Sequence, residues 1–257
     1  GGIASTEAQI STDSQSNSHV VWRGAGGTGG SINKEGGIIY YRRRNQIAFM
    51  DATWIEVSAH SNVCLNCTPR SHQPNIFVDS NNIATVVWAD NAARASIASC
   101  PASSNENAAS TDFDIYLRRY NGNTSIDANF GNTIKYQAPD TCSSSDESSQ
   151  PILSALDNGN LIVAWVETNA AGKSALKKVT QTNSSDGFLE FSTVENFLEQ
   201  DAESHSLEIL RKTPNEFHFF WLEKSVSDGS FPDLFFQDGD SSPVGDSHLL
   251  HATPKLD

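Results

Sequence analysis

The hydrophobic positions of the chain recur in four short segments, each of which ends in a tryptophan. The fifteen residues up to each tryptophan align without a gap, and their third position is always aliphatic. The middle of each segment carries the polar residues, glycine or proline that favour tight turns. Each segment therefore predicts a β-hairpin. The four segments are residues 8–22, 74–88, 151–165 and 207–221.

A second hairpin is predicted after each tryptophan, so that a unit of four strands is repeated four times. Such a repeat is typical of β-propeller blades. We expect one domain over residues 1–257, with blades at about 8–58, 74–138, 151–196 and 207–254. The predicted third strands are residues 37–44, 114–120, 174–180 and 232–238, and the predicted fourth strands are residues 53–58, 133–138, 189–194 and 247–253.

The strand that carries each tryptophan is apolar on both faces, as in the run Val86-Val87-Trp88. Strict alternation of apolar and polar residues would leave one face in water. Apolar residues on both faces indicate a strand that is packed between two neighbouring sheets. We therefore expect the four tryptophans to lie in the core rather than to bind a ligand. They are Trp22, Trp88, Trp165 and Trp221.

Composition and charge exclude some classes of function. The 257 residues carry a formal net charge of −14, which opposes binding to phosphate backbones, so no nucleic-acid partner is expected. The chain lacks a run of 18 apolar residues, so no membrane insertion is expected. The composition, 37% hydrophobic and 19% charged, suits many short strands and polar turns. The oligomeric state stays open.

The chain has four cysteines, and an even number favours disulfides and an oxidising compartment. We therefore expect a secreted, periplasmic or cell-surface protein. The repeat places all four cysteines in loops at one end of the propeller. We prefer the pairs Cys64–Cys67 and Cys100–Cys142, with the other pairings left open. No cofactor is expected, although the acidic turn at residues 238–246 leaves a structural Ca²⁺ as an open alternative.

The glycine-rich segment at residues 24–30 is not a nucleotide-binding loop. Phosphate-binding loops of the common types lead from a strand into a helix, whose N-terminus holds the phosphate. Here the next predicted element, residues 37–44, is another strand. The segment is therefore expected to connect the second and third strands of the first blade.

The blade pattern resembles that of secreted, sialidase-like β-propellers of bacteria, most clearly in the runs VVWAD from Val86 and IYLRR from Ile115. The resemblance covers nearly the whole chain and implies an all-β propeller of four four-stranded antiparallel blades. The Asp-box S-x-D-x-G-x-x-W and the opening F-R-I-P of sialidases are absent, which counts against sialidase activity. Four blades fit a closed ring, a part of a larger propeller, or two chains that complement each other. We expect a closed ring, because open sheet edges invite aggregation.

Candidate site residues lie where the second strands end. In an up-and-down blade, the loops after the second and fourth strands share one end, and these are the long loops of this chain. We call it the long-loop end, and we expect it to carry recognition residues, as variable loops on rigid scaffolds usually do. The candidates for ligand binding are Arg23, Asp90, Arg94, Glu167 and Glu223.

Three of these candidates are carboxylates related by the repeat, because Asp90, Glu167 and Glu223 each lie two positions after a tryptophan. They could act as acid and base in glycoside hydrolysis, bind a cation or basic ligand, or cap strand ends and pair with a neighbouring Arg or Lys. Gly24 takes this slot in the first blade. A ligand that enters asymmetrically is expected beside this carboxylate-free gap.

A basic pair recurs on the third strands, which indicates ion pairs between blades or side-chain stems that cover the core. The basic residues are Arg42, Arg43, Arg44, Arg118, Arg119, Lys177 and Lys178.

These observations favour a binding or adhesion module that recognises a glycan or protein through its long loops. The first alternative is a glycoside hydrolase or lyase that uses Asp90, Glu167 and Glu223. The second is a purely structural domain of a larger surface protein. Two carboxylates about 5–10 Å apart in a cleft would favour the enzyme, and carboxylates held in ion pairs would count against it.

Overall fold

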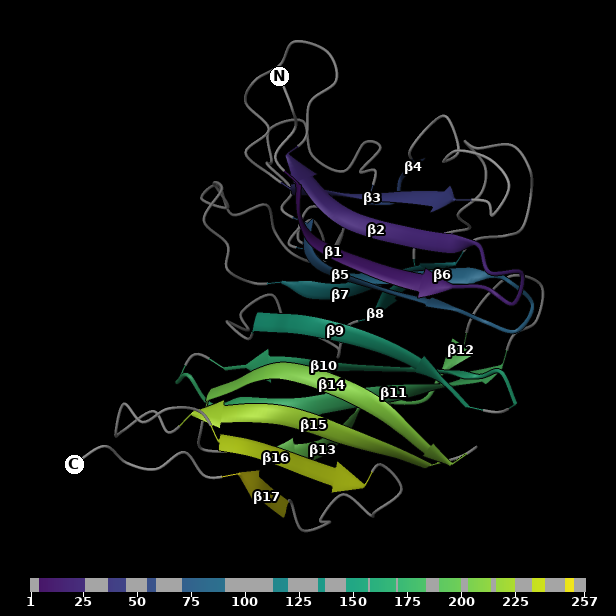
Figure 1. Cartoon of the computed structure of the whole chain (residues 1–257). Coiled ribbons are helices and arrows are strands. Elements are labelled where there is room, and N and C mark those ends of the chain that lie inside the picture. Colours follow the sequence, from purple (N-terminus) through teal and green to yellow (C-terminus); the bar gives the residue numbers. More distant parts are fainter. Residues whose placement is uncertain are drawn as a thin grey trace. The chain divides into compact units, whose positions relative to one another are not determined.

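The structure is a computed structural model, and every regular element that it describes is a β-strand (Figure 1). The strands form four antiparallel sheets, in three of which all strands follow one another in chain order. Among the described residues there is no helix long and apolar enough to cross a membrane. The described residues are 5–25, 37–44, 55–58, 71–90, 113–119, 134–136, 147–156, 158–169, 171–183, 190–199, 203–213, 216–224, 233–238 and 248–251.

The chain divides into two compact units, and the first, Gly1–Ser144, holds two sheets. We call these sheets blades 1 and 2. Blade 1 consists of β1 (Ser5–Thr12), β2 (Ser18–Ala25), β3 (Gly37–Arg44) and β4 (Ile55–Glu56), and blade 2 of β5 (Ser71–Val78), β6 (Ala84–Asp90), β7 (Asp114–Arg119) and β8 (Ile134–Tyr136). Because β3 follows β2 directly in the sheet, the glycine-rich segment connects two strands, as predicted.

The second unit, Ser145–Asp257, holds blades 3 and 4. Blade 3 consists of β9 (Glu147–Ala155), β10 (Leu161–Thr168), β11 (Ser174–Asn183), β12 (Glu190–Phe191) and β13 (Glu195–Glu199). Blade 4 consists of β14 (Glu203–Thr213), β15 (Glu216–Lys224), β16 (Asp233–Asp238) and β17 (His248–His251).

Blade 3 differs from the prediction in its outer strand, which is split into β12 and β13. Both pieces pair with β11, at opposite ends of it. Between them Ser192 breaks the regular ladder, because its side-chain Oγ accepts a hydrogen bond from the Thr180 N–H at 3.1 Å. The predicted strand at 189–194 covers only the first piece.

A β-bulge near the start of the first strands was not predicted. Glu7, Gln73 and Gln150 each directly precede an aligned segment, and each has a positive φ, of 55°, 51° and 52°. The strand register shifts at each of these places. Within each unit the bulge side chain reaches the next blade: Glu7 Oε2 accepts from the Gln73 N–H at 2.5 Å, and Gln150 Oε1 accepts from the Leu207 N–H at 3.2 Å.

The core of each unit lies between its two sheets. In the first unit β5 packs against β1, β2 and β3, and in the second β14 packs against β9, β10 and β11. All of β6 is buried, as are the first six residues of β10. The second strands of these blades are therefore covered on both faces, as their apolar sequences predict.

The tryptophans lie in these cores. Trp88, Trp165 and Trp221 are at most 1% exposed, whereas Trp22 is half-buried. Three of the four stack on the aromatic residue that faces them from the third strand, with ring centroids 5.8–5.9 Å apart. The stacked pairs are Trp22–Tyr40, Trp88–Tyr116 and Trp221–Phe235.

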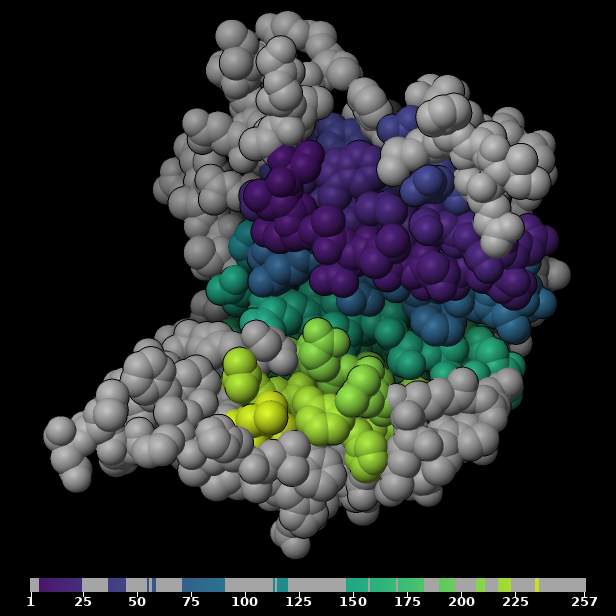
Figure 2. Space-filling view, in the orientation of Figure 1, coloured from purple at the N-terminus to yellow at the C-terminus, as the bar shows by residue number. Residues whose placement is uncertain are grey.

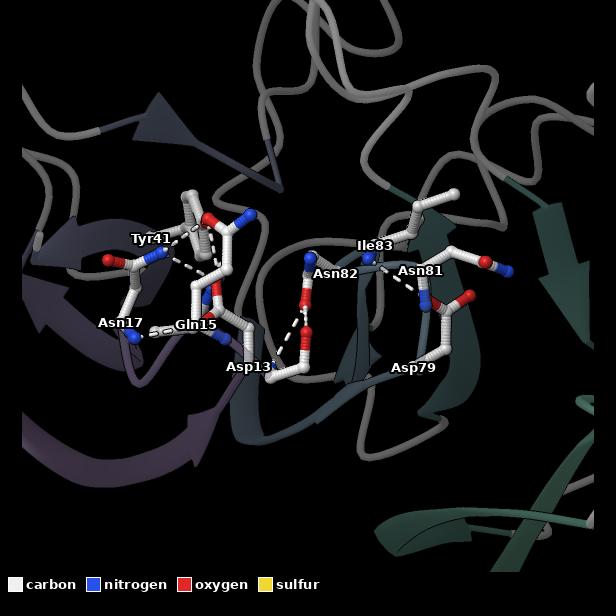
Figure 3. Close-up of polar contacts among 10 residues, drawn as sticks. Asp13, Gln15, Asn17, Tyr41, Asp79, Asn81, Asn82 and Ile83 are labelled. Atoms are coloured by element: carbon white, nitrogen blue, oxygen red, sulfur yellow. Dashed lines mark hydrogen bonds and ion pairs between the residues drawn. The ribbon is translucent and has the colours of Figure 1, made fainter.

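The turns between first and second strands are held by aspartates at the end opposite the long loops (Figure 3). Each Oδ1 accepts two backbone N–H groups, which fixes a tight turn. Asp13 accepts from Gln15 and Asn17 at 2.9 and 2.7 Å, and Asp79 accepts from Asn81 and Ile83 at 2.9 Å each. Ser14 joins the two turns, because its N–H and Oγ–H both donate to Asn82 Oδ1, at 3.0 and 2.7 Å.

The second oxygen of each turn aspartate holds a basic side chain. His19 Nε2 lies 3.2 Å from Asp13 Oδ2, and His19 Nδ1 lies 2.8 Å from the Tyr41 hydroxyl. In blade 2, Arg119 Nη2 donates to Asp79 Oδ2 at 2.7 Å. His19 is therefore a buried polar residue that links the turn of blade 1 to β3.

Replacing a fully buried tryptophan should cost more stability than replacing the half-buried one at the same repeat position. We expect Trp88→Ala to lower the free energy of unfolding by about 3–5 kcal/mol, because it opens a cavity between two sheets. Trp22→Ala should cost clearly less. Urea unfolding followed by circular dichroism measures both, and equal losses would contradict the burial described above.

Acid should weaken the turn of blade 1. Burial by itself raises the pKa of Asp13, but hydrogen bonds from Asn17 and His19 lower it below its usual value. The resulting stabilisation is complete above the unfolded pKa, about 3.9, and is lost as the pH falls through the folded pKa.

We therefore expect Asp13→Asn to cost about 1–3 kcal/mol of unfolding free energy at pH 7, because it leaves the Asn17 side-chain amide without its acceptor. The loss should shrink in acid, below the folded pKa of Asp13. Urea titrations across this pH range test it, with the exposed Glu190→Gln as a control. A loss that is the same at every pH would rule out the charged contact.

Candidate functional site

The second strands end at the long-loop end, where each faces the beginning of a first strand. A serine stands opposite the slot two positions after the tryptophan in every blade. The facing pairs are Ser5–Gly24, Ser71–Asp90, Ser148–Glu167 and Ser204–Glu223. In blades 1 to 3 this serine lies two residues before the bulge position. Extending the sequence alignment by three residues would have revealed the recurring serine.

Asp90 is fully buried and is bound by its own sheet. Its Oδ2 accepts hydrogen bonds from Ser71 Oγ at 2.5 Å and from Trp88 Nε1 at 3.1 Å. The carboxylate therefore ties the end of β6 to the start of β5 and satisfies the indole N–H of a core residue. This matches the strand-capping role that the sequence left open for it.

Glu167 forms an ion pair with Lys177 of the neighbouring strand β11. The two side chains are only 15% and 12% exposed, so little water competes with the pair. Glu223 faces Ser204 on one side and Asp233 on the other by strand register. Its side chain, like all of Arg94, is outside the described residues.

A mixed cluster of charges occupies the long-loop end of the first unit. Arg23 Nη1 lies 3.4 Å from Glu7 Oε1, and the two side chains are 32% and 33% exposed. His72, at the start of β5, interacts electrostatically with both of these residues and with Asp90. Its ring also meets the edge of the Phe113 ring, with centroids 4.2 Å apart. We call Glu7, Arg23, His72 and Asp90 the blade 1–2 cluster.

Burial lowers the pKa of His72, and the positive charge of Arg23 lowers it further, against the opposing effects of Glu7 and Asp90. The imidazole is therefore neutral at pH 7, with one nitrogen that donates and one that accepts a hydrogen bond. Of this cluster the sequence selected Arg23 and Asp90 and missed Glu7 and His72. The cluster lies beside Gly24, the carboxylate-free slot at which an asymmetric ligand was expected.

Gly37 closes this cluster from the start of β3. A Cβ atom built there would lie 2.1 Å from Arg23 Nε and 2.5 Å from the Ser71 carbonyl oxygen. The backbone therefore approaches both groups too closely for any side chain. Glycine at this position keeps Arg23 where it meets Glu7.

Three of the basic residues of the third strands pair with carboxylates of their own blade. These ion pairs are Arg119–Asp79, Lys177–Glu167 and Lys178–Glu195. These three basic residues therefore serve ion pairs within a sheet.

Several predictions concern segments outside the described residues. Cys64, Cys67, Cys100 and Cys142 all lie there, so the disulfides, and the secretion inferred from them, stay predictions. The acidic turn proposed for Ca²⁺ also lies there apart from Asp238.

No model of a protein family matches the sequence, and no curated protein matches it either. Solved structures do match its fold. The Hadza microbial sialidase Hz136 superposes with a TM-score of 0.64 at 11% identity, over 97% of this chain and 47% of its own. A Penicillium chrysogenum α-L-arabinanase, in complex with arabinobiose, gives 0.56 at 10% identity, over 96% of this chain and 66% of its own. A Trypanosoma rangeli sialidase gives 0.53 at 10% identity, over 95% and 38%.

The chain has a sialidase-like β-propeller fold. The prediction of an all-β protein with four antiparallel blades is thereby confirmed. The chain spans between 38% and 66% of the length of these similar structures. Closure of the ring stays a prediction.

Removing one partner of the Glu167–Lys177 pair should destabilise the protein more than removing both. We expect Glu167→Gln or Lys177→Met alone to cost about 1–3 kcal/mol, because a half-buried charge is left without its partner. The double variant should cost less than the sum of the two. The Lys178–Glu195 pair, in which Glu195 is 50% exposed, is the matched control with coupling below about 1 kcal/mol. Equal coupling in the two pairs, measured by urea unfolding, would contradict this assignment.

Proposed function

We propose that this chain is a glycan-acting β-propeller domain of the glycoside hydrolase type. The observation that carries the proposal is its fold likeness, over at least 95% of the chain, to two sialidases and an α-L-arabinanase. Since one fold hosts many functions, the chemistry has to come from the residues of the site. We place that site at the long-loop end, where polar side chains gather on the rigid ends of strands.

Glycoside hydrolysis requires two carboxyl groups, one to protonate the leaving group and one to act as base or nucleophile. We keep Asp90, Glu167 and Glu223 as the candidates. Asp90 is fully buried, so access of a glycan to it would need movement of residues that now cover it. Glu7 adds a carboxylate at the same end that solvent already reaches.

The second candidate is a module that binds a glycan without cleaving it. The engagement of Asp90 by Ser71 and Trp88, and of Glu167 by Lys177, favours this function. A carboxylate that already accepts hydrogen bonds within its sheet is poorly placed to exchange a proton with a substrate. We propose that either function is exercised outside the cytoplasm, as a secreted or surface protein.

Both candidates are tested by incubating the protein with arabinan oligosaccharides, sialyllactose and lactose, and by measuring released sugars and binding in parallel. A hydrolase should release sugars, and Asp90→Asn, Glu167→Gln or Glu223→Gln should reduce the rate by about 10²-fold or more. A binding module should bind without releasing sugars. The exposed Glu190→Gln is the control that should behave as the native protein.

Neither binding nor release with any of these glycans would contradict the proposal and favour the purely structural alternative. Thermal unfolding of each variant, measured beside the assays, separates loss of activity from loss of fold.

A further inference from the structure

The blade 1–2 cluster contains polar atoms that the fold does not satisfy. His72 Nε2 and Arg23 Nε are both buried and have no hydrogen-bond partner within the described part of the chain. Buried polar groups are nearly always hydrogen-bonded, so an unfilled group calls for a functional explanation. Here two such atoms, one from each of two blades, belong to one cluster.

The outer part of the same cluster is open to solvent. About a third of the Glu7 and Arg23 side chains is exposed, and the N-terminal hairpin that carries them forms part of the surface in Figure 2 (purple). The cluster thus combines a partly exposed carboxylate and guanidinium with the half-buried His72 and the fully buried Asp90.

The charges of the cluster argue against an anionic ligand. Glu7 and Asp90 carry two negative charges, Arg23 one positive charge, and His72 is neutral at pH 7, so the sum is −1. Arg23 is already paired with Glu7. A carboxylate on a ligand would meet two carboxylates and a guanidinium that is occupied, and juxtaposed like charges are strongly unfavourable.

Hydroxyl groups fit the cluster better. Each hydroxyl both donates and accepts, so neighbouring hydroxyls can donate to Glu7 and accept from Arg23 at once. The neutral imidazole of His72 can either donate a hydrogen bond to a hydroxyl group or accept one from it. The edge of Phe113 against His72 adds an apolar border, as is usual in small-molecule sites.

We propose that Glu7, Arg23 and His72 form a binding site for an uncharged sugar, and that Glu7 is the residue that makes this site reject carboxylated sugars. The inference rests on the proposed glycan-acting function and deepens it by naming the ligand class. Glu7 acts by occupying Arg23, which would otherwise be free to pair with an anionic ligand.

The repeat supplies a matched variant for the test. Gln73 and Gln150 occupy the position of Glu7 in blades 2 and 3, with the same positive φ. Gln150 accepts a backbone N–H of the next blade, as Glu7 does. Glu7→Gln should therefore keep the bulge and the contact with blade 2 while it removes the charge.

The experiment compares lactose with sialyllactose, which differ by one carboxylated sugar, and includes arabinobiose as a second neutral probe. Binding is measured by calorimetry, and the His72 ring resonances are followed by NMR. The native protein should bind a neutral sugar at least about tenfold more tightly than sialyllactose, since like charges repel. The His72 resonances should shift with the neutral sugar.

Glu7→Gln should reduce the ratio of the affinities for a neutral sugar and for sialyllactose by about tenfold, because Arg23 is then free to pair with the carboxylate of sialyllactose. His72→Ala should weaken binding of the neutral sugar by about tenfold, the effect of one lost hydrogen bond in a buried site, whereas His218→Ala in blade 4 should not. Circular dichroism and thermal unfolding check that each variant is folded. If His72→Ala does not fold, the NMR shift of His72 in the native protein decides.

Tighter binding of sialyllactose than of lactose by the native protein would overturn the inference but leave the proposed function standing. The inference would also be overturned, with the proposed function left standing, if a neutral sugar bound without shifting any His72 resonance. The same conclusion would follow if Glu7→Gln and His72→Ala left the affinity for the neutral sugar and the preference over sialyllactose unchanged. Absence of binding and cleavage with every glycan would overturn both the inference and the proposed function.

Discussion

The rest of the structure depends on second strands that are buried on both of their faces, as blades 2 and 3 show most fully. In blade 2 no residue of that strand reaches solvent, and in blade 3 its first six residues do not either. The interior of such a strand is mostly apolar, because a polar group there has no water and needs a partner within the protein. Chemistry is therefore confined to the strand ends, the turns and the loops.

At the ends, the polar residues that recur with the repeat serve the fold. Asp13 and Asp79 hold the turns at one end, and Asp90 and Glu167 are engaged at the other by Ser71, Trp88 and Lys177. A carboxylate that recurs in several blades thus has a structural role, because the turn or strand end that it stabilises recurs in the same blades. The residues that break the repeat are the more informative ones, and they include Gly24 together with the ion pair of Glu7 and Arg23.

The comparison with solved structures separates architecture from activity. At 10–11% identity, sialidases and an arabinanase share the fold of this chain although their names differ in substrate. A propeller presents strand ends in the same way whatever they bind, so the ligand has to be inferred from charge and hydrogen-bonding capacity. In the blade 1–2 cluster these properties point to hydroxyl groups rather than to a carboxylate.

The amino-acid sequence by itself determined the strand pattern, the order of the strands within each sheet and the burial of Trp88, Trp165 and Trp221, because these follow from local periodicity and short turns. It also located Arg23 and Asp90 at one end of a blade. Only the tertiary structure decided what these residues do. The pairing of Glu7 with Arg23, the unsatisfied nitrogen of His72 and the hydrogen bonds of Asp90 depend on how the side chains of neighbouring strands are placed in space. The bulge at Glu7 depends on a positive φ, which glutamate seldom adopts and which no local preference of its sequence predicts.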